Sequence, residues 1–269
     1  MSAPKPAKLG IVAGAGALPG LLAAACRAEG RPYFILGLNG FADDTALGQA
    51  PDARIRMGEA GQGFALMRQA GVTEIVMAGG VRRPTLAILR PDIKTALFFA
   101  RIIGRSLGDD GLLRAVIAEI EREGFSVVGP HEILTSLLAP SGPIGMRTPD
   151  AEAQRDIKIG IVAALELGQA DIGQAVVVRN GAVVGREDAA GTAALIARSG
   201  AGGVLVKMKK PQQDRRADLP AIGPDTIAQA AAAKLSGIAV EAGGTLVLDL
   251  PAVRKAADTA GVFVVGVTP

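Results

Sequence analysis

The sequence is poor in the residues on which several protein classes depend. Its one cysteine, Cys26, excludes an internal disulfide and any site with several thiolate ligands. Its one histidine, His131, excludes zinc sites that need two imidazoles. Aromatic residues make up 3% of the chain and tryptophan is absent, so the stacking platforms of single-strand nucleic-acid binders are missing. We expect Cys26, midway along an alanine-rich helix, to pack in the protein core, and His131 to stand at the start of a helix.

The chain also lacks a large excess of charge of either sign, because it has 29 basic and 26 acidic residues and a net charge of +3. That balance argues against a nucleic-acid partner. Apolar residues, in contrast, make up 49% of the 269 residues, which is enough for the core of one to two globular domains.

The high mean hydropathy of +0.34 raises the question of a membrane segment. The uncharged run over 9–26 resembles a secretory signal, but its four glycines and Pro19 would break a short apolar helix. No later run reaches the roughly 18 apolar residues that a membrane span requires. We therefore expect a cytoplasmic protein with at most transient, peripheral contact with a membrane.

The first half of the chain alternates between short apolar runs and helical stretches. The pattern predicts strands over 8–13, 32–36, 54–57, 73–78 and 125–129, and helices ending near 29 and covering 63–70 and 109–123. Such alternation is typical of βαβ units, so we expect an α/β fold with a Rossmann-like parallel sheet.

The second half of the chain shows a different order of predicted strands and helices. Two β-branched runs joined by Asn180-Gly181 predict a hairpin, a helix is expected over 149–167, and further strands are expected near 204–207, 238–240, 246–248 and 262–265. A proline- and glycine-rich stretch separates the halves. We expect a Rossmann-like N-terminal domain at 1–138, a linker at 139–148, and a C-terminal mixed α/β domain at 149–269.

Two glycine turns follow predicted strands of the first half. Gly14-Ala15-Gly16 stands between a strand and a helix, where backbone N–H groups can bind an anion. It is not a full dinucleotide fingerprint, because Pro19 takes the place of the third glycine. Gly80-Val81-Arg82 would lie at the same carboxyl edge of a parallel sheet. We expect both turns to bind a nucleotide or phosphate, although a plain tight turn would use the same glycines.

The most informative passage is 207–226, which mixes five cations with three carboxylates between proline-containing turns. Its carboxylates are Asp214, Asp218 and Asp225, and its cations include Lys210 and Arg216. Carboxylate oxygens suit Mg²⁺, and lysine and arginine neutralise phosphate oxygens during phosphoryl transfer. The segment therefore predicts metal-assisted hydrolysis of a phosphate ester or anhydride.

Each of these residues could also have a purely structural role instead of a role in catalysis or binding. Asp225 could be the N-cap of the helix that follows it. Asp214 and Asp218 could pair with Arg215 and Arg216 on the surface, and the lysines could form a solubilising strand end.

Five stretches together resemble the LpxI-type UDP-2,3-diacylglucosamine pyrophosphatases over nearly the whole chain. They are residues 9–19, 80–82, 109–113, 173–178 and above all 207–226, whose pattern is Lys207-x-x-Lys210-Pro-x-Gln-Asp214-x-Arg216-x-Asp218-Leu-Pro-x-Ile-Gly-Pro-Asp225-Thr226. One departure concerns Gly191-Thr192, which has alanine on both sides where the family would have acidic residues.

The resemblance implies Mg²⁺-dependent cleavage of UDP-2,3-diacylglucosamine to UMP and 2,3-diacylglucosamine 1-phosphate, in lipid A biosynthesis. It implies two tethered domains with the lipid-linked sugar nucleotide in the cleft between them, and a homodimer. The family's key aspartate corresponds to Asp225, and Gly191 and Thr192 correspond to substrate-binding positions. We expect Asp225, with Asp214 or Asp218, to hold Mg²⁺ and position the attacking water.

On the same hypothesis, Arg216, Lys210 and Arg82 would stabilise the pyrophosphate oxygens, and the two glycine turns would supply backbone donors. Two other functions stay open. One is an NAD(P)-dependent oxidoreductase built on the Gly14 turn, with Asp43 or Asp44 holding the ribose. The other is a non-catalytic regulator that binds a sugar nucleotide or lipid and uses the charged segment only as a phosphate clamp.

Overall fold

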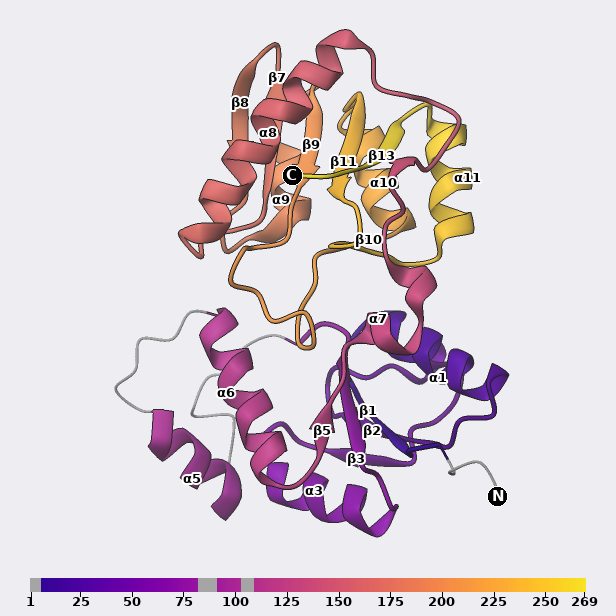
Figure 1. The fold of residues 1–269 in the computed structure, drawn as a ribbon, viewed down its shortest axis with the longest axis vertical. Helices are drawn as coiled ribbons and strands as arrows, with labels where there is room; N and C mark the ends of the chain where they lie inside the picture. Colours follow the sequence, from indigo (N-terminus) through magenta and orange to yellow (C-terminus); the bar gives the residue numbers. More distant parts are fainter. Residues whose placement is uncertain (1–5, 82–90, 103–108) are drawn as a thin grey trace. The chain divides into compact units, whose positions relative to one another are not determined.

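The structure is a computed structural model, and it describes residues 6–81, 91–102 and 109–269. The chain divides into two compact units (Figure 1). Unit 1 consists of Met1–Thr135 with the short segment Arg215–Asp218, and unit 2 consists of Ser136–Asp214 with Leu219–Pro269. No helix in the described part of the chain combines the length and apolar character needed to cross a bilayer.

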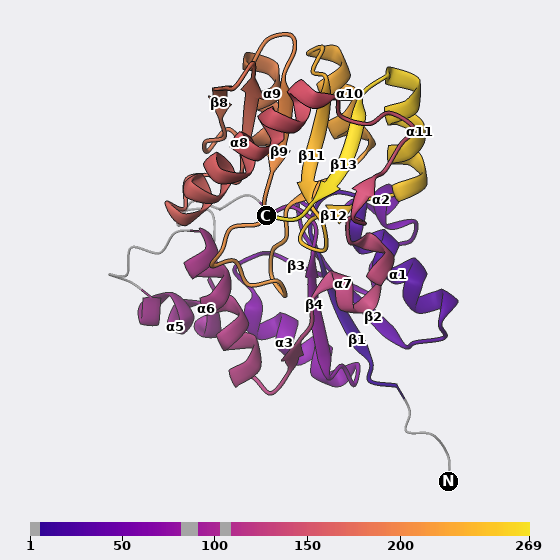
Figure 2. The same ribbon diagram turned by 45° about the horizontal axis from the view of Figure 1, so that its top comes forward.

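Unit 1 is built on a parallel sheet of five strands in the order β3-β2-β1-β4-β5. Figure 2 labels strands β1 to β4 of this sheet. The strands are β1 (Leu9–Ala13), β2 (Tyr33–Leu38), β3 (Ala53–Ile55), β4 (Glu74–Ala78) and β5 (Ser126–Val127). This order is that of the doubly wound dinucleotide-binding fold, so the predicted Rossmann-like sheet is confirmed.

The described helices of unit 1 are α1 (Leu18–Ala28), α2 (Asp44–Leu47), α3 (Ala60–Gln69), α5 (Ile93–Ile102), α6 (Asp109–Arg122) and α7 (Pro130–Ile133). Cys26 of α1 is fully buried, as predicted, and burial raises the pKa of its thiol. His131 lies in the first turn of α7, also as predicted. Helix α5 was not expected from the sequence.

The segment Arg215–Asp218 belongs to unit 1 although both of its flanks belong to unit 2. Ala217 packs against the apolar core between the sheet and helices α3 and α6. Arg216 forms an ion pair of 2.8 Å with Glu121 of α6. The short segment is therefore fixed to unit 1 by both an apolar and a charged contact.

Unit 2 contains a mixed sheet in the order β6-β13-β11-β9-β7-β8, which confirms the predicted mixed α/β architecture. Its strands are β6 (Gly142–Pro143), β7 (Ala175–Arg179), β8 (Ala182–Arg186), β9 (Val204–Lys207), β11 (Gly237–Glu241) and β13 (Phe263–Val267). Two further short strands, β10 (Ala221–Ile222) and β12 (Leu246–Val247), pair in parallel. Strands β7 and β8 form the predicted hairpin, with Asn180 and Gly181 both at positive φ as a type I′ turn requires.

Alternate side chains along the strands of unit 2 enter different apolar cores. Helix α8 (Ala151–Gln169) covers one face of the sheet (Figure 1). Val176, Val178 and Val206 pack against it. Val177 and Leu205 pack on the other face, with α9 (Gly191–Arg198), α10 (Pro224–Ala232) and α11 (Leu250–Ala260). Because helices cover both faces of the sheet, side chains that point to either face are apolar. Strands β7 and β9 are therefore continuous apolar runs in the sequence.

Residues 139–148, the predicted linker, start with the buried Ala139 and include strand β6. Strand β6 pairs with β13, and the N–H of Ile144 donates to the carbonyl of Val264 at 2.8 Å. In the structure these residues are assigned to unit 2.

Candidate functional site

The two glycine turns of unit 1 lie against each other. Strands β1 and β4 are parallel neighbours, so the turns leave the same carboxyl edge of the sheet, as the sequence predicted. Ala15 and Gly80 exchange both backbone hydrogen bonds, at 2.9 and 2.8 Å, and the N–H of Gly14 donates to the carbonyl of Ala78 at 2.8 Å. The amides of Gly14, Ala15 and Gly80 are therefore used inside the protein.

Close approach of the two turns explains two of their glycines. A Cβ at Gly14 would lie 2.7 Å from the carbonyl oxygen of Gly80, and one at Gly79 would lie 2.6 Å from that of Ala15. Gly16, in contrast, has a φ of +92° and open space around its α-carbon, and Gly80 also has room for a side chain. Packing thus accounts for Gly14 and Gly79 without a ligand, whereas Gly16 faces space that a ligand can enter.

The other residues predicted around these turns are described only in part. Val81 is exposed, and Arg82 lies outside the described residues. Both acids of the oxidoreductase alternative have structural partners: Asp43 caps α2 by accepting from the N–H of Thr45 at 2.9 Å, and Asp44 forms an ion pair with Arg54. A ribose would have to compete with these contacts, which weakens the oxidoreductase interpretation.

In unit 2 the structure joins Thr192 to a buried lysine. Lys207, the last residue of β9, is 7% exposed, and its Nζ donates to Oγ1 of Thr192 at 3.0 Å and to the carbonyl of Ala221 at 3.3 Å. The hydroxyl of Thr192 in turn donates to Oε1 of Glu187, whose Oε2 accepts from the N–H of Gln174 at 2.8 Å. The chain Glu187–Thr192–Lys207 therefore holds an ammonium group in a fixed position.

Glu187 is a residue that the sequence analysis missed. An acidic residue was expected directly beside Gly191-Thr192, where both neighbours are alanine, but Glu187 reaches Thr192 from five residues upstream. Its side chain is buried, and that burial is tolerated because both carboxylate oxygens accept hydrogen bonds. The signal in the sequence was an acidic residue directly after a strand, a position that the expected motif did not include.

Asp225 stands exposed in the first turn of α10. The N-cap of this helix is Gly223, whose N–H donates to Oγ1 of Thr226 at 3.3 Å, so the interpretation of Asp225 as the N-cap is wrong. Strand β10, which carries the carbonyl that accepts from Lys207, ends only three residues before Asp225. The chain therefore places a fixed ammonium group and an exposed carboxylate on neighbouring parts of unit 2.

The remaining predicted charges are divided between the units. Asp214 lies in unit 2, whereas Arg216 and Asp218 lie in unit 1. Lys210, predicted to bind phosphate, is 8% exposed and pairs with Asp171 at 2.7 Å. Because Lys207 and Lys210 are both buried, their interpretation as a solubilising strand end is wrong.

Among the residues that the structure describes, we find no metal-binding cluster, that is, no group of three or more histidine, cysteine, aspartate or glutamate side chains that could hold a metal ion. Mg²⁺, however, usually keeps several waters and takes only one or two carboxylates together with substrate phosphates. The exposed carboxylate of Asp225 supplies the hard oxygen donor that such an ion prefers. The donor chemistry of unit 2 thus fits a metal ion that is bound with its substrate.

Comparison with known proteins covers both units. Residues 8–137 match the LpxI N-terminal domain, and residues 140–265 match the LpxI C-terminal domain. The UDP-2,3-diacylglucosamine pyrophosphatase LpxI of Caulobacter vibrioides is 42% identical over 275 residues, covering 97% of this chain and 98% of that protein. These matches extend over both glycine turns and the whole charged segment, and from them we conclude that the chain belongs to the LpxI family.

Proposed function

We propose that this chain hydrolyses the pyrophosphate bond of UDP-2,3-diacylglucosamine, a reaction of lipid A biosynthesis. Water adds to one phosphorus, the bridging P–O bond breaks, and UMP and 2,3-diacylglucosamine 1-phosphate leave. The observation that carries the proposal is the 42% identity, over nearly the full length of both chains, to a protein named for this activity.

We assign the central role in this reaction to Asp225. Its carboxylate is exposed in the first turn of α10, where the positive end of a helix dipole favours negative charge, and it can bind a cation or accept a proton. Asp214, in the same unit, is the second carboxylate of the proposed set. When bound by these oxygens, Mg²⁺ would neutralise phosphate charge and make a bound water more acidic.

The cation that we assign to the pyrophosphate is Lys207. Its ammonium group is held in place by the hydroxyl of Thr192 and the carbonyl of Ala221, at 3.0 and 3.3 Å. Lys210 and Arg216, which the sequence also predicted as phosphate ligands, are paired with the carboxylates of Asp171 and Glu121. In unit 1, the glycine turn leaves open space at Gly16 beside the start of α1, where an anionic group can bind.

A turnover assay tests this function. Purified protein is incubated with UDP-2,3-diacylglucosamine and Mg²⁺, and UMP release is followed by chromatography; we expect multiple turnovers, and their loss on addition of EDTA. Binding of the substrate without UMP release would overturn the proposal in favour of a regulator. Stabilisation against heat by NAD(P)H, but not by UDP or UMP, would favour an oxidoreductase.

We further propose that the active form is a homodimer that contacts the membrane only transiently. Size-exclusion chromatography with light scattering tests the first statement. Sedimentation with phospholipid vesicles tests the second, because transient contact predicts that most of the protein stays in the supernatant.

A further inference from the structure

The solvent-facing side of helix α5 in unit 1 is apolar. Ile93, Ala96, Leu97 and Ala100 recur at the three- and four-residue spacing that places side chains on one face of a helix. All four are exposed, and the two large side chains, those of Ile93 and Leu97, are 80% and 54% exposed. Thr95, on the opposite side of the helix, is buried. We call Ile93, Ala96, Leu97 and Ala100 the α5 stripe.

Such a stripe is unusual on a surface helix. Helices at the surface of a globular protein normally turn charged and polar side chains to the solvent and apolar ones to the core. An exposed apolar surface bordered by polar residues marks a place where a protein meets a partner or a membrane. The α5 stripe therefore indicates a contact with another molecule, and the charges beside it show which kind.

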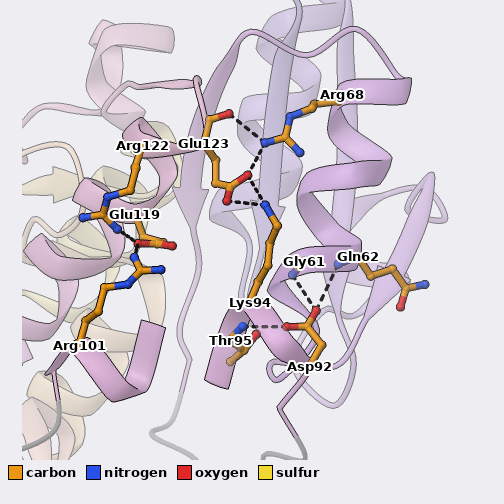
Figure 3. A network of polar contacts seen from close by, with 10 residues as sticks. All are labelled: Gly61, Gln62, Arg68, Asp92, Lys94, Thr95, Arg101, Glu119, Arg122 and Glu123. Atoms are coloured by element: carbon orange, nitrogen blue, oxygen red, sulfur yellow. Dashed lines mark hydrogen bonds and ion pairs between the residues drawn. The ribbon is translucent and has the colours of Figure 1, made fainter. Parts of the chain in front are cut away.

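Two cations of α5 itself border the stripe. Lys94 pairs with Glu123 at 2.5 Å, and Arg101 pairs with Glu119 of α6 at 2.5 Å (Figure 3). Both basic residues are neighbours in sequence of stripe residues, one at each end of the helix. The ion pairs hold α5 in place and fix its cations next to the apolar side chains.

Each of the two carboxylates binds a second cation as well. Glu123 also pairs with Arg68 of α3, and Glu119 also pairs with Arg122 of α6 (Figure 3). The side chains of Glu119 and Glu123 are only 11% and 15% exposed, whereas all four cationic side chains are roughly half exposed. This surface therefore presents positive charge to the solvent, with four cations over two largely buried carboxylates.

The combination of apolar and cationic side chains suits the surface of an anionic bilayer. Ile93 and Leu97 would enter the boundary between headgroups and acyl chains, and the flexible stems of lysine and arginine reach from there to lipid phosphates. Each basic side chain near an anionic membrane adds to the affinity. Because α5 has ten residues and is about 15 Å long, it can lie along a bilayer surface but is far too short to span it.

Other partners fit this surface less well. The centre of a protein–protein interface is depleted of lysine and acidic residues, and a stable interface takes in about 20–30 residues on each side. The α5 stripe has two large apolar side chains, and cations border it. A nucleic acid would use the cations but not the apolar side chains.

We propose that the α5 stripe and the four cations beside it dock unit 1 on the surface of an anionic phospholipid bilayer. Ile93 and Leu97 enter the interfacial layer, and the cations contact the lipid phosphates. The choice of a membrane as the partner rests on the membrane contact that forms part of the proposed function; the exposure and the charge of the surface do not depend on it.

Vesicle flotation tests the surface without any reaction. The full-length protein is mixed with increasing amounts of vesicles made of phosphatidylcholine alone or of equal parts of phosphatidylcholine and phosphatidylglycerol. At low lipid we expect most of the protein to stay free, and the bound fraction to rise with the amount of anionic lipid and to fall as salt is added. Absence of binding to anionic vesicles, or equal binding to both kinds, would overturn the proposal.

An apolar-to-charged variant links the binding to α5. Ile93→Glu places a carboxylate in the proposed contact, so the lipid concentration at half-binding should rise at least about tenfold. The matched control is Met146→Glu, which makes a similar change at a position of unit 2 that is 81% exposed and should bind as the wild type does. If Ile93→Glu does not fold, as judged by circular dichroism, Ile93→Ser replaces it. Wild-type binding by a folded Ile93 variant would exclude the stripe.

A charge variant tests the cations separately. Arg68→Gln together with Arg122→Gln removes two exposed cations, while each carboxylate keeps its partner on α5. Binding to anionic vesicles should weaken at least about tenfold. The control, Lys158→Gln together with Lys255→Gln, removes the same charge from exposed positions of unit 2 and should bind as the wild type does. Equal binding by the two double variants would show that this surface does not attract the protein to lipid.

Turnover of a water-soluble, short-chain substrate analogue separates the docking surface from the proposed hydrolysis. Ile93→Glu should hydrolyse the analogue at the wild-type rate, because the side chain of Ile93 points to the solvent. Turnover by the wild type without binding to anionic vesicles would refute the docking surface alone. Vesicle binding through the α5 stripe without turnover would refute the hydrolysis alone.

Discussion

The ammonium nitrogen of Lys207 lies 3.0 Å from the hydroxyl oxygen of Thr192, and this contact joins the end of β9 to the first turn of α9. The same hydroxyl donates its proton to the buried carboxylate of Glu187. One hydroxyl group therefore stands between a buried cation and a buried anion, and it hydrogen-bonds to both.

Removal of that hydroxyl should affect stability and activity together. Thr192→Val keeps the shape but leaves Glu187 and Lys207 without their shared partner, so we expect a loss of about 1–3 kcal/mol in the free energy of unfolding. Hydrolysis should fall because Lys207 is no longer held in one position. Thr192→Ser keeps the hydroxyl and serves as the control. Urea unfolding and UMP release measure the two effects, and equal behaviour of the two variants would show that the hydroxyl is dispensable.

Asp225→Asn should separate activity from stability. The amide has the same size but no charge, and we expect a loss of at least about 10²-fold in kcat, as for the removal of one strong electrostatic contact to a reacting group. Stability should change by less than about 1 kcal/mol, the usual contribution of an exposed first-turn carboxylate to a helix. Glu152→Gln, which neutralises an exposed first-turn carboxylate of α8, is the matched control and should keep full activity. Hydrolysis by the Asp225→Asn variant at the wild-type rate would remove Asp225 from the mechanism.

The glycine turns predict a contrast between two equivalent substitutions. Gly14→Ala places a Cβ 2.7 Å from the carbonyl oxygen of Gly80, which forces the turns apart, so we expect a destabilisation of about 1–3 kcal/mol. Gly80→Ala finds open space and should stay within about 0.5 kcal/mol of the wild type. Thermal unfolding of both variants measures the difference. Similar melting temperatures would mean that the turns are not in the close contact described above.

His131 should make stability depend on pH in the weakly acidic range below 6.5. Burial, reinforced by the nearby charge of Arg215, lowers the pKa of its imidazole below 6.5. In the range between the lowered pKa and 6.5 the unfolded chain binds more protons than the folded one, so the free energy of unfolding falls as the pH decreases through it. His131→Gln should remove this part of the pH dependence, as measured by urea unfolding at several pH values. An unchanged slope in the variant would assign it to other groups.

Local patterns predicted much of the fold, because the spacing of apolar residues that distinguishes a strand from a helix is a property of neighbouring residues. The hairpin at Asn180-Gly181 and strand β9 formed where the sequence placed them. Helix α5 was missed: Lys94 and Arg101 stand on one of its faces, but the apolar Ile93 is 80% exposed on the same side and interrupts the polar pattern.

The predicted site depended on contacts that no local pattern encodes. Sequence spacing selected Asp225 and Lys210 from one charged segment, but the partner of Lys210, Asp171, stands 39 residues upstream. Glu187 likewise meets Lys207 only through Thr192 and the arrangement of the unit 2 sheet. The residue types of the site could be read from the sequence, whereas the contacts that hold each charged side chain in place required the fold.

The four residues of Arg215–Asp218 have a consequence for how this protein can be divided. The polypeptide passes from one unit to the other three times, after Thr135, after Asp214 and after Asp218. A fragment that stops at Thr135 would lose Ala217 from its core and the guanidinium partner of Glu121. Neither half is therefore a contiguous gene segment, and dissection, domain exchange or circular permutation has to carry this short insert along with the part of the chain that it completes.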